Sequence, residues 1–292
     1  MTEPGIVIVG GDSRIGAAAA RRLRTDGAAV TVTSRRDTAA IRLDLAAPAE
    51  TWPALPEGGA WVVAAAIASL ARCRDEPALA RRVNAEAVEH LARQAERRGA
   101  FLVLLSTNQV FDGTRPHRAD GDPPCPITEY GRTKADAEAA ILALGPSGAI
   151  VRLTKVLAPD EALMQGWMAD LRQGRPIHPA ADMVLAPVAQ AVAAQAIGRV
   201  ARERLAGIIQ VSATRDISYA AAAAVIAAEM KADATLVRPR SATELGLSLE
   251  FQPRWTSLDT TGFAARLGMV ASAPDQPLRA LVHHQSTIEQ GP

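Results

Sequence analysis

Cysteine, tyrosine and lysine are scarce in this chain, and it has no long apolar run. Its two cysteines, Cys73 and Cys125, are too few for a disulfide framework or a cysteine-based metal site. No apolar run reaches the roughly 18 residues that a membrane-spanning helix needs. The formal net charge of +1 indicates neither a nucleic-acid footprint nor a polybasic membrane patch. With no basic-then-apolar leader before the first apolar run, we expect a cytoplasmic protein that binds neither nucleic acid nor membrane and holds no metal.

The overall composition is typical of an ordinary folded protein. Hydrophobic residues make up 48% of the chain and charged residues 22%, which predicts a sizeable apolar core. A length of 292 residues suits one large domain or two modest domains.

The scarcity of tyrosine and lysine makes the spacing of one pair informative. Tyr130 and Lys134, from a total of two tyrosines and three lysines, lie four residues apart. On a helix this spacing places both side chains on one face. A cation one turn away favours the phenolate, which predicts a phenol pKa below its usual value of about 10. The spacing therefore indicates an acid–base pair.

The start of the chain has the pattern of a nucleotide-binding unit. An apolar, β-branched run at 5–9 predicts a buried strand, and a glycine-containing turn at 10–16 leads into a helix that ends near 26–27. In such a unit, backbone N–H groups and the positive helix end receive a pyrophosphate. Serine replaces the usual middle glycine of the turn. The residues expected to bind the cofactor here are Gly10, Ser13, Arg14, Ile15 and Gly16.

The end of the second expected strand, at 29–33, indicates which cofactor is used. An acidic residue at this position binds ribose hydroxyls, whereas arginine accommodates a 2′-phosphate. Here Ser34 is followed by Arg35 and Arg36, and Arg14 is expected nearby. We predict NADP(H) in preference to NAD(H), with surface arginines as the alternative interpretation.

Further strands are expected at 41–45, 61–66, 101–105 and 149–153, and helices at 77–98 and 130–144. The strand at 101–105 delivers Ser106 and Thr107 to the carboxyl edge, where open α/β sheets bind ligands. Small side chains after the fourth strand allow a cofactor to lie close. The additional residues expected at the cofactor are Asp44, Ala64, Ala65, Ala66 and Ser106.

This alternation predicts an α/β fold, a Rossmann-type doubly wound parallel sheet. We expect an NADP(H)-binding domain over residues 1–155. A smaller, partly interleaved substrate-binding region is expected over 156–292, with some segments returning to the first domain. Helices are predicted at 163–173, 188–205 and 218–229, and a strand at 207–211.

Several motifs together resemble one family. They are Ser106-Thr107-x-x-Val110-Phe111-Asp112-Gly113, Tyr130-Gly131-x-x-Lys134, Arg152-Leu153-Thr154 and Arg254-Trp255-Thr256-Ser257-Leu258-Asp259. The chain resembles an extended short-chain dehydrogenase/reductase of the dTDP-4-dehydrorhamnose reductase-like branch of sugar-nucleotide enzymes. The resemblance implies that Thr107 polarises the substrate carbonyl and Tyr130 transfers the proton. It also implies that Lys134 holds the nicotinamide ribose and tunes the phenol.

The chain departs from the family pattern where the sugar is expected. Asn108 and Gln109 replace the usual Asp-Tyr, and Thr128 replaces an asparagine before the tyrosine. Lys155 takes the place of an aromatic residue, and it faces either an anionic group of the substrate or solvent. Asn108, Gln109 and Lys155 are the expected substrate-binding residues, and the identity of the sugar stays open.

The resemblance leaves three functions open. The first is an NADPH-dependent reductase of a keto-sugar nucleotide of the 4-keto-deoxysugar type, or of a similar activated sugar. The second is an NAD-dependent sugar-nucleotide epimerase or dehydratase, which retains its cofactor tightly. The third is a non-catalytic, nucleotide-binding regulatory subunit of another enzyme. The superfamily also makes a homodimer possible.

Overall fold

A parallel sheet at the centre of the protein carries the candidate site at one edge. The computed structural model describes residues 5–247 and 252–289, and in these ranges seven parallel strands follow the order β10-β6-β5-β4-β1-β2-β3. Between β1 and β4 the strand order reverses direction, and such switch points bind ligands at their carboxyl ends. The predicted Rossmann-type fold class is confirmed. The strands are β1 (Ile6–Val9), β2 (Val30–Ser34), β3 (Ile41–Arg42), β4 (Ala60–Val63), β5 (Phe101–Thr107), β6 (Gly148–Leu153) and β10 (Gly207–Val211).

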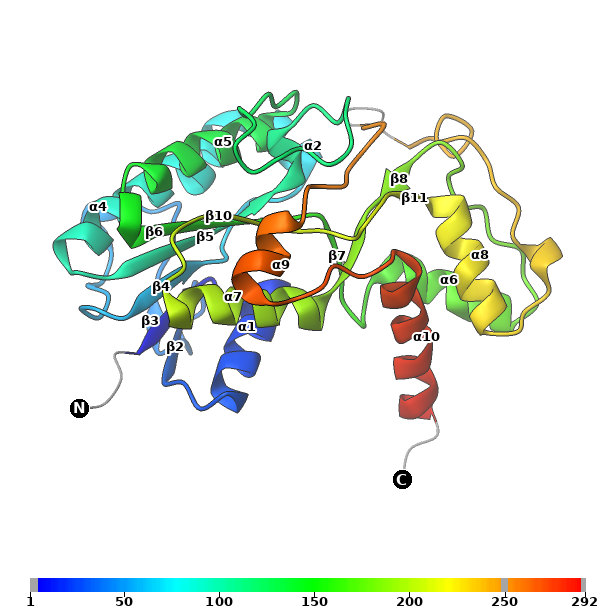
Figure 1. Ribbon diagram of the computed structural model, residues 1–292, viewed down its shortest axis with the longest axis horizontal. Helices are drawn as coiled ribbons and strands as arrows, with labels where there is room; N and C mark the ends of the chain where they lie inside the picture. Colours follow the sequence, from blue (N-terminus) through cyan, green and yellow to red (C-terminus); the bar gives the residue numbers. More distant parts are fainter. Residues whose placement is uncertain (1–4, 248–251, 290–292) are drawn as a thin grey trace.

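Helices cover both faces of this sheet (Figure 1). On one face lie α1 (Arg14–Thr25), α7 (Gln190–Glu203) and α9 (Thr261–Leu267), and on the other lie α4 (Ala87–Arg97) and α5 (Glu129–Leu142). Successive strand residues point to opposite faces, so the β-branched runs supply two apolar cores at once. In β1, for example, Ile6 and Ile8 pack toward α1 and α7, whereas Val7 and Val9 pack toward α4.

Two predicted elements have different bounds. The helix predicted at 77–98 is divided into α3 (Pro77–Arg81), a π-helical turn (Arg82–Glu86) and α4, and it is preceded by α2 (Leu70–Asp75). In the π turn, the buried Asn84 side chain accepts a hydrogen bond from the Ile67 N–H at 2.8 Å and donates one to the Ile67 carbonyl at 3.0 Å. The strand predicted at 41–45 ends at Arg42, because the Asp44 carboxylate accepts the Ala46 N–H at 3.0 Å and turns the chain.

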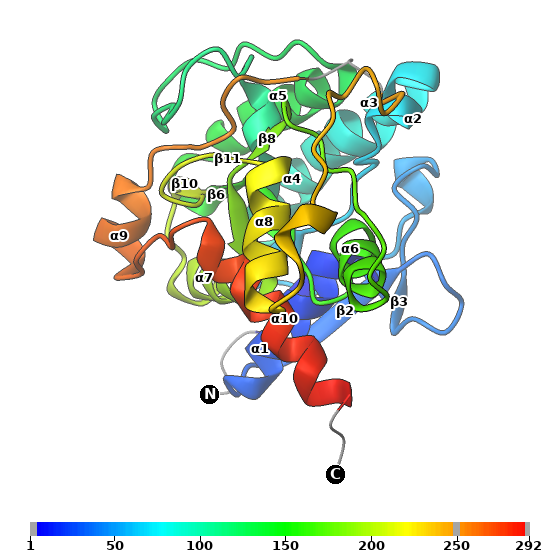
Figure 2. The same ribbon diagram turned by 90° about the vertical axis from the view of Figure 1, so that its right-hand side faces the viewer.

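The C-terminal part of the chain forms a second cluster of helices beside the sheet (Figure 1), and this cluster faces the viewer in Figure 2. Met164, Trp167, Ile226 and Leu278 belong to its separate apolar core. Both α7 and β10 lie beyond residue 155 in the sequence but belong to the main sheet and its core, so the two regions interleave in the fold. The domain boundary stays a prediction. The elements of this cluster are β7 (Lys155–Leu157), α6 (Ala162–Arg172), β8 (Val184–Leu185), β9 (Pro187–Ala189), β11 (Ile217–Ser218), α8 (Tyr219–Glu229) and α10 (Asp275–Glu289).

Short 3₁₀ turns connect several of these elements. The turn Asn108–Val110 follows β5 and shapes the candidate site. The others are Ala49–Thr51, Gly145–Ser147 and Ala234–Leu236. In the part of the chain that the structure describes, no helix has both the length and the apolar character needed to cross a membrane.

Candidate active site

Most of the predicted site residues meet in one hollow at the carboxyl edge of the sheet. We call it the central pocket, and its volume is about 570 Å³. It opens where β5, β6 and the start of α5 converge, and β7, β8 and α8 form its far wall. The predicted residues that line it are Ser13, Arg14, Ile15, Ala64, Ala66, Ser106, Thr107, Asn108, Gln109, Tyr130 and Lys155.

A second hollow, here the outer pocket, adjoins the first and has a volume of about 380 Å³. The two share Ser13, Ala66 and Ala68 as lining residues, so together they follow the sheet edge across the switch point. The predicted residues that line the outer pocket are Gly10, Ser13, Ser34, Arg35, Asp44, Ala65 and Ala66. A cofactor with two linked halves fits this arrangement, since its diphosphate would lie at the shared wall near the start of α1.

The glycine turn explains why serine is tolerated at its middle position. The Ser13 hydroxyl accepts the Gly16 N–H at 3.1 Å and donates to the Gly10 carbonyl at 2.8 Å, so it caps α1. Gly10 has φ +86°, and a Cβ there would lie 2.6 Å from the Cβ of Ala65, so this position requires glycine. The turn thus approaches the neighbouring strand end closely.

Three arginines lie around the outer pocket, and one was not predicted. Arg35 lines the pocket, whereas Arg36 is exposed, with its Nε 3.9 Å from the Asp12 carboxylate. Arg72, in the short helix α2, also lines the pocket, and its Nε donates to Glu76 at 3.0 Å. Sequence patterns missed Arg72 because the short helix that carries it was not expected.

Thr107 and Tyr130 line the central pocket, whereas the buried Lys134 is not part of its lining. The Thr107 hydroxyl accepts the Gln109 N–H at 3.2 Å, which leaves its own proton available for donation. Tyr130 and Lys134 lie one turn apart on α5. Lys134 is 2% exposed, and its side chain has no hydrogen bond or ion pair to another described residue. A Cβ on Gly131 would lie 2.2 Å from the Gln109 carbonyl, so α5 begins in direct contact with the 3₁₀ turn.

The pKa values of this pair differ from the sequence-based expectation. Burial raises the pKa of Tyr130 to about 12, and the nearby Cys73 thiol adds to the increase. Burial lowers the pKa of Lys134 to about 8, against an opposing effect of the Glu138 carboxylate. The prediction of a lowered phenol pKa is therefore wrong for this structure, because desolvation has the larger effect. At neutral pH the phenol keeps its proton.

A buried polar row stands behind these residues. Ser106, Arg152 and Gln210 are register partners on β5, β6 and β10 and face the same side of the sheet. Glu138 of α5 meets this row: Ser106 Oγ donates to it at 2.5 Å, and the Arg152 Nη2 does so at 2.7 Å. Arg152 also donates to Gln210 at 3.3 Å. The row joins α5 to three strands, and the hydroxyl of Ser106, a residue expected at the cofactor, donates to Glu138. The cofactor contact of Ser106 stays a prediction.

Two loops close one side of the central pocket. The Asp216 carboxylate accepts hydrogen bonds from the N–H of Thr256 at 2.6 Å and from the hydroxyl of Ser257 at 2.6 Å. The Trp255 N–H donates to the Gly113 carbonyl at 3.0 Å. These bonds give a structural reason for the C-terminal motif, whose Thr256 lines the pocket. Asp216 was not predicted, because it lies 40 positions before Thr256 in the sequence and only the fold brings the two residues together.

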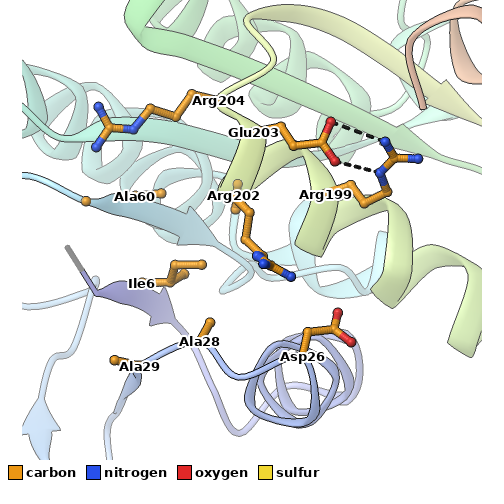
Figure 3. A pocket seen from close by; sticks show the side chains of 11 residues that line it. Ile6, Asp26, Ala28, Ala29, Ala60, Arg199, Arg202, Glu203 and Arg204 are labelled. Carbon is orange, nitrogen blue, oxygen red and sulfur yellow. Dashed lines mark hydrogen bonds and ion pairs between the residues drawn. The ribbon is translucent and has the colours of Figure 1, made fainter. Parts of the chain in front are cut away.

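A further hollow lies at the opposite edge of the sheet (Figure 3). It has a volume of about 370 Å³ and lies between the ends of α1 and α7. Its Arg199 and Glu203 side chains form an ion pair with each other, with Nε 2.7 Å from Oε1. None of the predicted site residues lines this hollow, which separates it from the candidate site. No cluster of three or more metal-ligating side chains occurs among the described residues.

The fold and the two adjoining pockets define a Rossmann-type α/β protein, with a groove along the sheet edge where proteins of this fold bind dinucleotides. A family model for the RmlD substrate binding domain matches residues 4–286. The dTDP-4-dehydrorhamnose reductase of Streptomyces griseus is 30% identical over 286 residues, which cover 90% of this chain and 88% of that protein. The chain belongs to the RmlD substrate binding domain family, and the resemblance inferred from the motifs is confirmed.

Two further comparisons extend this finding. Methionine adenosyltransferase 2 subunit beta of Pongo abelii is 39% identical over 89 residues, or 30% of this chain; the match spans only 27% of that protein's length. The crystal structure of dTDP-4-dehydrorhamnose reductase from Bacillus anthracis, in complex with NADP, has a TM-score of 0.81 and 20% identity. It covers 97% of this chain and 99% of that one, and at this identity the likeness shows the fold.

Proposed function

We propose that the protein is an NADPH-dependent reductase of a keto-sugar nucleotide, of the 4-keto-deoxysugar type or a similar activated sugar. The observation that carries this proposal is the meeting of Thr107 and Tyr130 in one pocket, with Lys134 directly behind on α5. Support comes from the reductase relative that matches 88% of its length and from the NADP complex of a structural neighbour. NADP(H) is the preferred cofactor because Arg35 lines the outer pocket, and NAD(H) stays possible.

The arrangement suits a carbonyl reduction. A bound nicotinamide supplies the hydride, and the carbonyl oxygen then develops negative charge that needs donors nearby. Thr107 donates its hydroxyl hydrogen, since its oxygen already accepts the Gln109 N–H. Tyr130 carries its proton at neutral pH, because burial raises its pKa to about 12, and it gives that proton to the oxygen. Lys134 places a positive charge one turn behind the phenol.

The test is consumption of NADPH with dTDP-4-dehydrorhamnose as the probe. Tyr130→Phe should lower kcat by about 100- to 10,000-fold, the usual contribution of a general acid. Thr107→Val should lower it by about 100-fold, as expected for one oxyanion donor. The matched control is Thr25→Val, on the exposed end of α1, which should leave kcat unchanged. Full activity of Tyr130→Phe would show that the proton comes from elsewhere.

The match to methionine adenosyltransferase 2 subunit beta favours a second candidate, a nucleotide-binding regulatory subunit. This alternative predicts NADPH binding without turnover of any sugar nucleotide. It also predicts a stable complex with a methionine adenosyltransferase, measurable by size-exclusion chromatography. The Thr107, Tyr130 and Lys134 set is intact, which favours the reductase.

Cofactor retention tests the epimerase alternative. Stoichiometric NAD⁺ that survives purification would favour an epimerase or dehydratase, whereas reversible and NADPH-selective binding would favour the reductase. The possible homodimer stays a prediction, and sedimentation velocity measures it directly.

A further inference from the structure

Lys155 lies beside the position where the reacting sugar is proposed to bind. It opens β7, two residues after Leu153, and Leu153 is the register partner of Thr107 on the neighbouring strand. Its side chain lines the central pocket and is 38% exposed. Lys155 and Thr107 therefore line the same pocket.

The charges around Lys155 leave capacity for a ligand. Its Nζ lies 2.8 Å from the Glu161 carboxylate, which uses one of the three N–H donors of an ammonium group. Glu161 also accepts from the Arg14 Nη1 at 3.3 Å, so two cations share this carboxylate. Asp160 lies 4.0 Å from the Arg14 Nε, but its side chain is 74% exposed and solvent screens it. The four charges balance formally, so the capacity for a ligand lies in the two ammonium N–H donors of Lys155 that Glu161 leaves unused.

Tyr219 provides a second donor on the same side of the pocket. The edge of its ring packs against Trp167, with centroids 6.4 Å apart and planes at 85°. Its hydroxyl has no hydrogen bond to another residue in the described ranges, although it lines the pocket. Burial raises the pKa of Tyr219, whereas Lys155 lowers it and Glu161 raises it, so both charged groups act on this phenol. The protonated hydroxyl can donate to an acceptor.

We infer that Lys155 and Tyr219 form an anion subsite of the central pocket, which binds a carboxylate or phosphate group of the substrate. Among the described residues that line this pocket, only Arg14 and Lys155 are basic, and Arg14 belongs to the glycine turn. Glu161 is the internal counter-ion that competes for the ammonium group. This inference deepens the proposed function and rests on it only for where the sugar lies.

Binding of three probes to the NADP-saturated protein tests the subsite. Isothermal titration calorimetry gives the Kd of dTDP, UDP-glucose and UDP-glucuronate, of which only the last carries a sugar carboxylate. Lys155→Met should weaken at least one anionic interaction by about tenfold or more, as expected for a hydrogen bond to a charged group. Tyr219→Phe should weaken the binding of the same probe several-fold. The matched control is Lys231→Met, an exposed lysine beyond α8, which should leave every Kd unchanged.

The pattern of losses identifies the bound group. Equal weakening of all three probes places the diphosphate at Lys155, whereas weakening of UDP-glucuronate alone places a sugar carboxylate there. Glu161→Gln should lower the Kd of the probe that Lys155→Met weakens, and this gain in affinity should vanish in the Lys155→Met/Glu161→Gln double variant. Unchanged Kd values in Lys155→Met, or no binding of any probe to the wild-type protein, would overturn the subsite. NADPH consumption is measured separately, so a protein without reductase activity can still confirm the subsite.

Discussion

The buried ion pair between Arg152 and Glu138 leads to the most informative stability prediction. Their side chains are 1% and 2% exposed, and Arg152 donates to Glu138 through both Nε and Nη2. Removing one partner of a buried pair leaves an uncompensated charge, which costs about 3–5 kcal/mol. We therefore expect Arg152→Met to lower the free energy of unfolding by about 4 kcal/mol and Tm by on the order of 10 °C.

The two single substitutions should differ in cost. In Arg152→Met, Glu138 keeps only the Ser106 hydroxyl among the donors described above. In Glu138→Gln, Arg152 still donates to the Asp120 carbonyl at 3.2 Å and lies 4.9 Å from the centre of the Phe111 ring. Glu138→Gln should therefore be the milder variant. Removing both charges together should recover part of the loss, since neither charge is then left alone.

Urea unfolding of the wild type, both single variants and the Glu138→Gln/Arg152→Met double variant measures the coupling between the two residues. We expect a coupling energy of about 2 kcal/mol or more, near the upper end for contacting residues. Simple additivity of the two single losses would refute the reasoning, because it would mean that neither charge depends on the other. The same variants report on the site, since the pair holds α5, which carries Tyr130, against β6.

Three further predictions concern the cofactor and the start of α5. Arg35→Ala should weaken the binding of NADPH by about tenfold or more and that of NADH much less, as measured by fluorescence titration, and Arg36→Ala should have a smaller effect. Equal losses of affinity for both cofactors would exclude binding of the 2′-phosphate by Arg35. Burial lowers the pKa of Lys134 from 10.5 to about 8. Between these two pH values the unfolded chain holds a proton that the folded chain lacks, so the free energy of unfolding rises with pH. The Lys134→Met variant should lack this rise of about 3 kcal/mol, measured by urea unfolding at pH 7 and pH 10.5. The same change in the free energy of unfolding for the wild type and the variant would contradict the prediction. Gly131→Ala places a Cβ about 2.2 Å from the Gln109 carbonyl and should cost roughly 1–3 kcal/mol in thermal unfolding, with unchanged stability as the contrary result.

Residues that are close in sequence account for most of the correct predictions. The strand, glycine turn and helix at the start of the chain follow from periodicity and from residues within one short segment. The facing of Tyr130 and Lys134 follows from a helical repeat alone. The prediction of one continuous helix over 77–98 was wrong. Asn84 bonds to the backbone of Ile67, 17 positions earlier, and a π turn interrupts the helix at this contact.

The sequence by itself determined the parallel α/β fold and the family, because local periodicity and fixed motif spacing carry that information. The assignment of Thr107, Tyr130 and Lys134 as the catalytic set stays a prediction. Tertiary structure alone decided the environment of those residues. Ser106 meets Glu138 across 32 positions, Arg152 meets Gln210 across 58, and Arg14 meets Glu161 across 147. Burial, which depends on the whole packed chain, reversed the expected direction of the Tyr130 pKa. Spacing along a chain places charges on an element, but only packing sets their solvation, and solvation controls what those charges do.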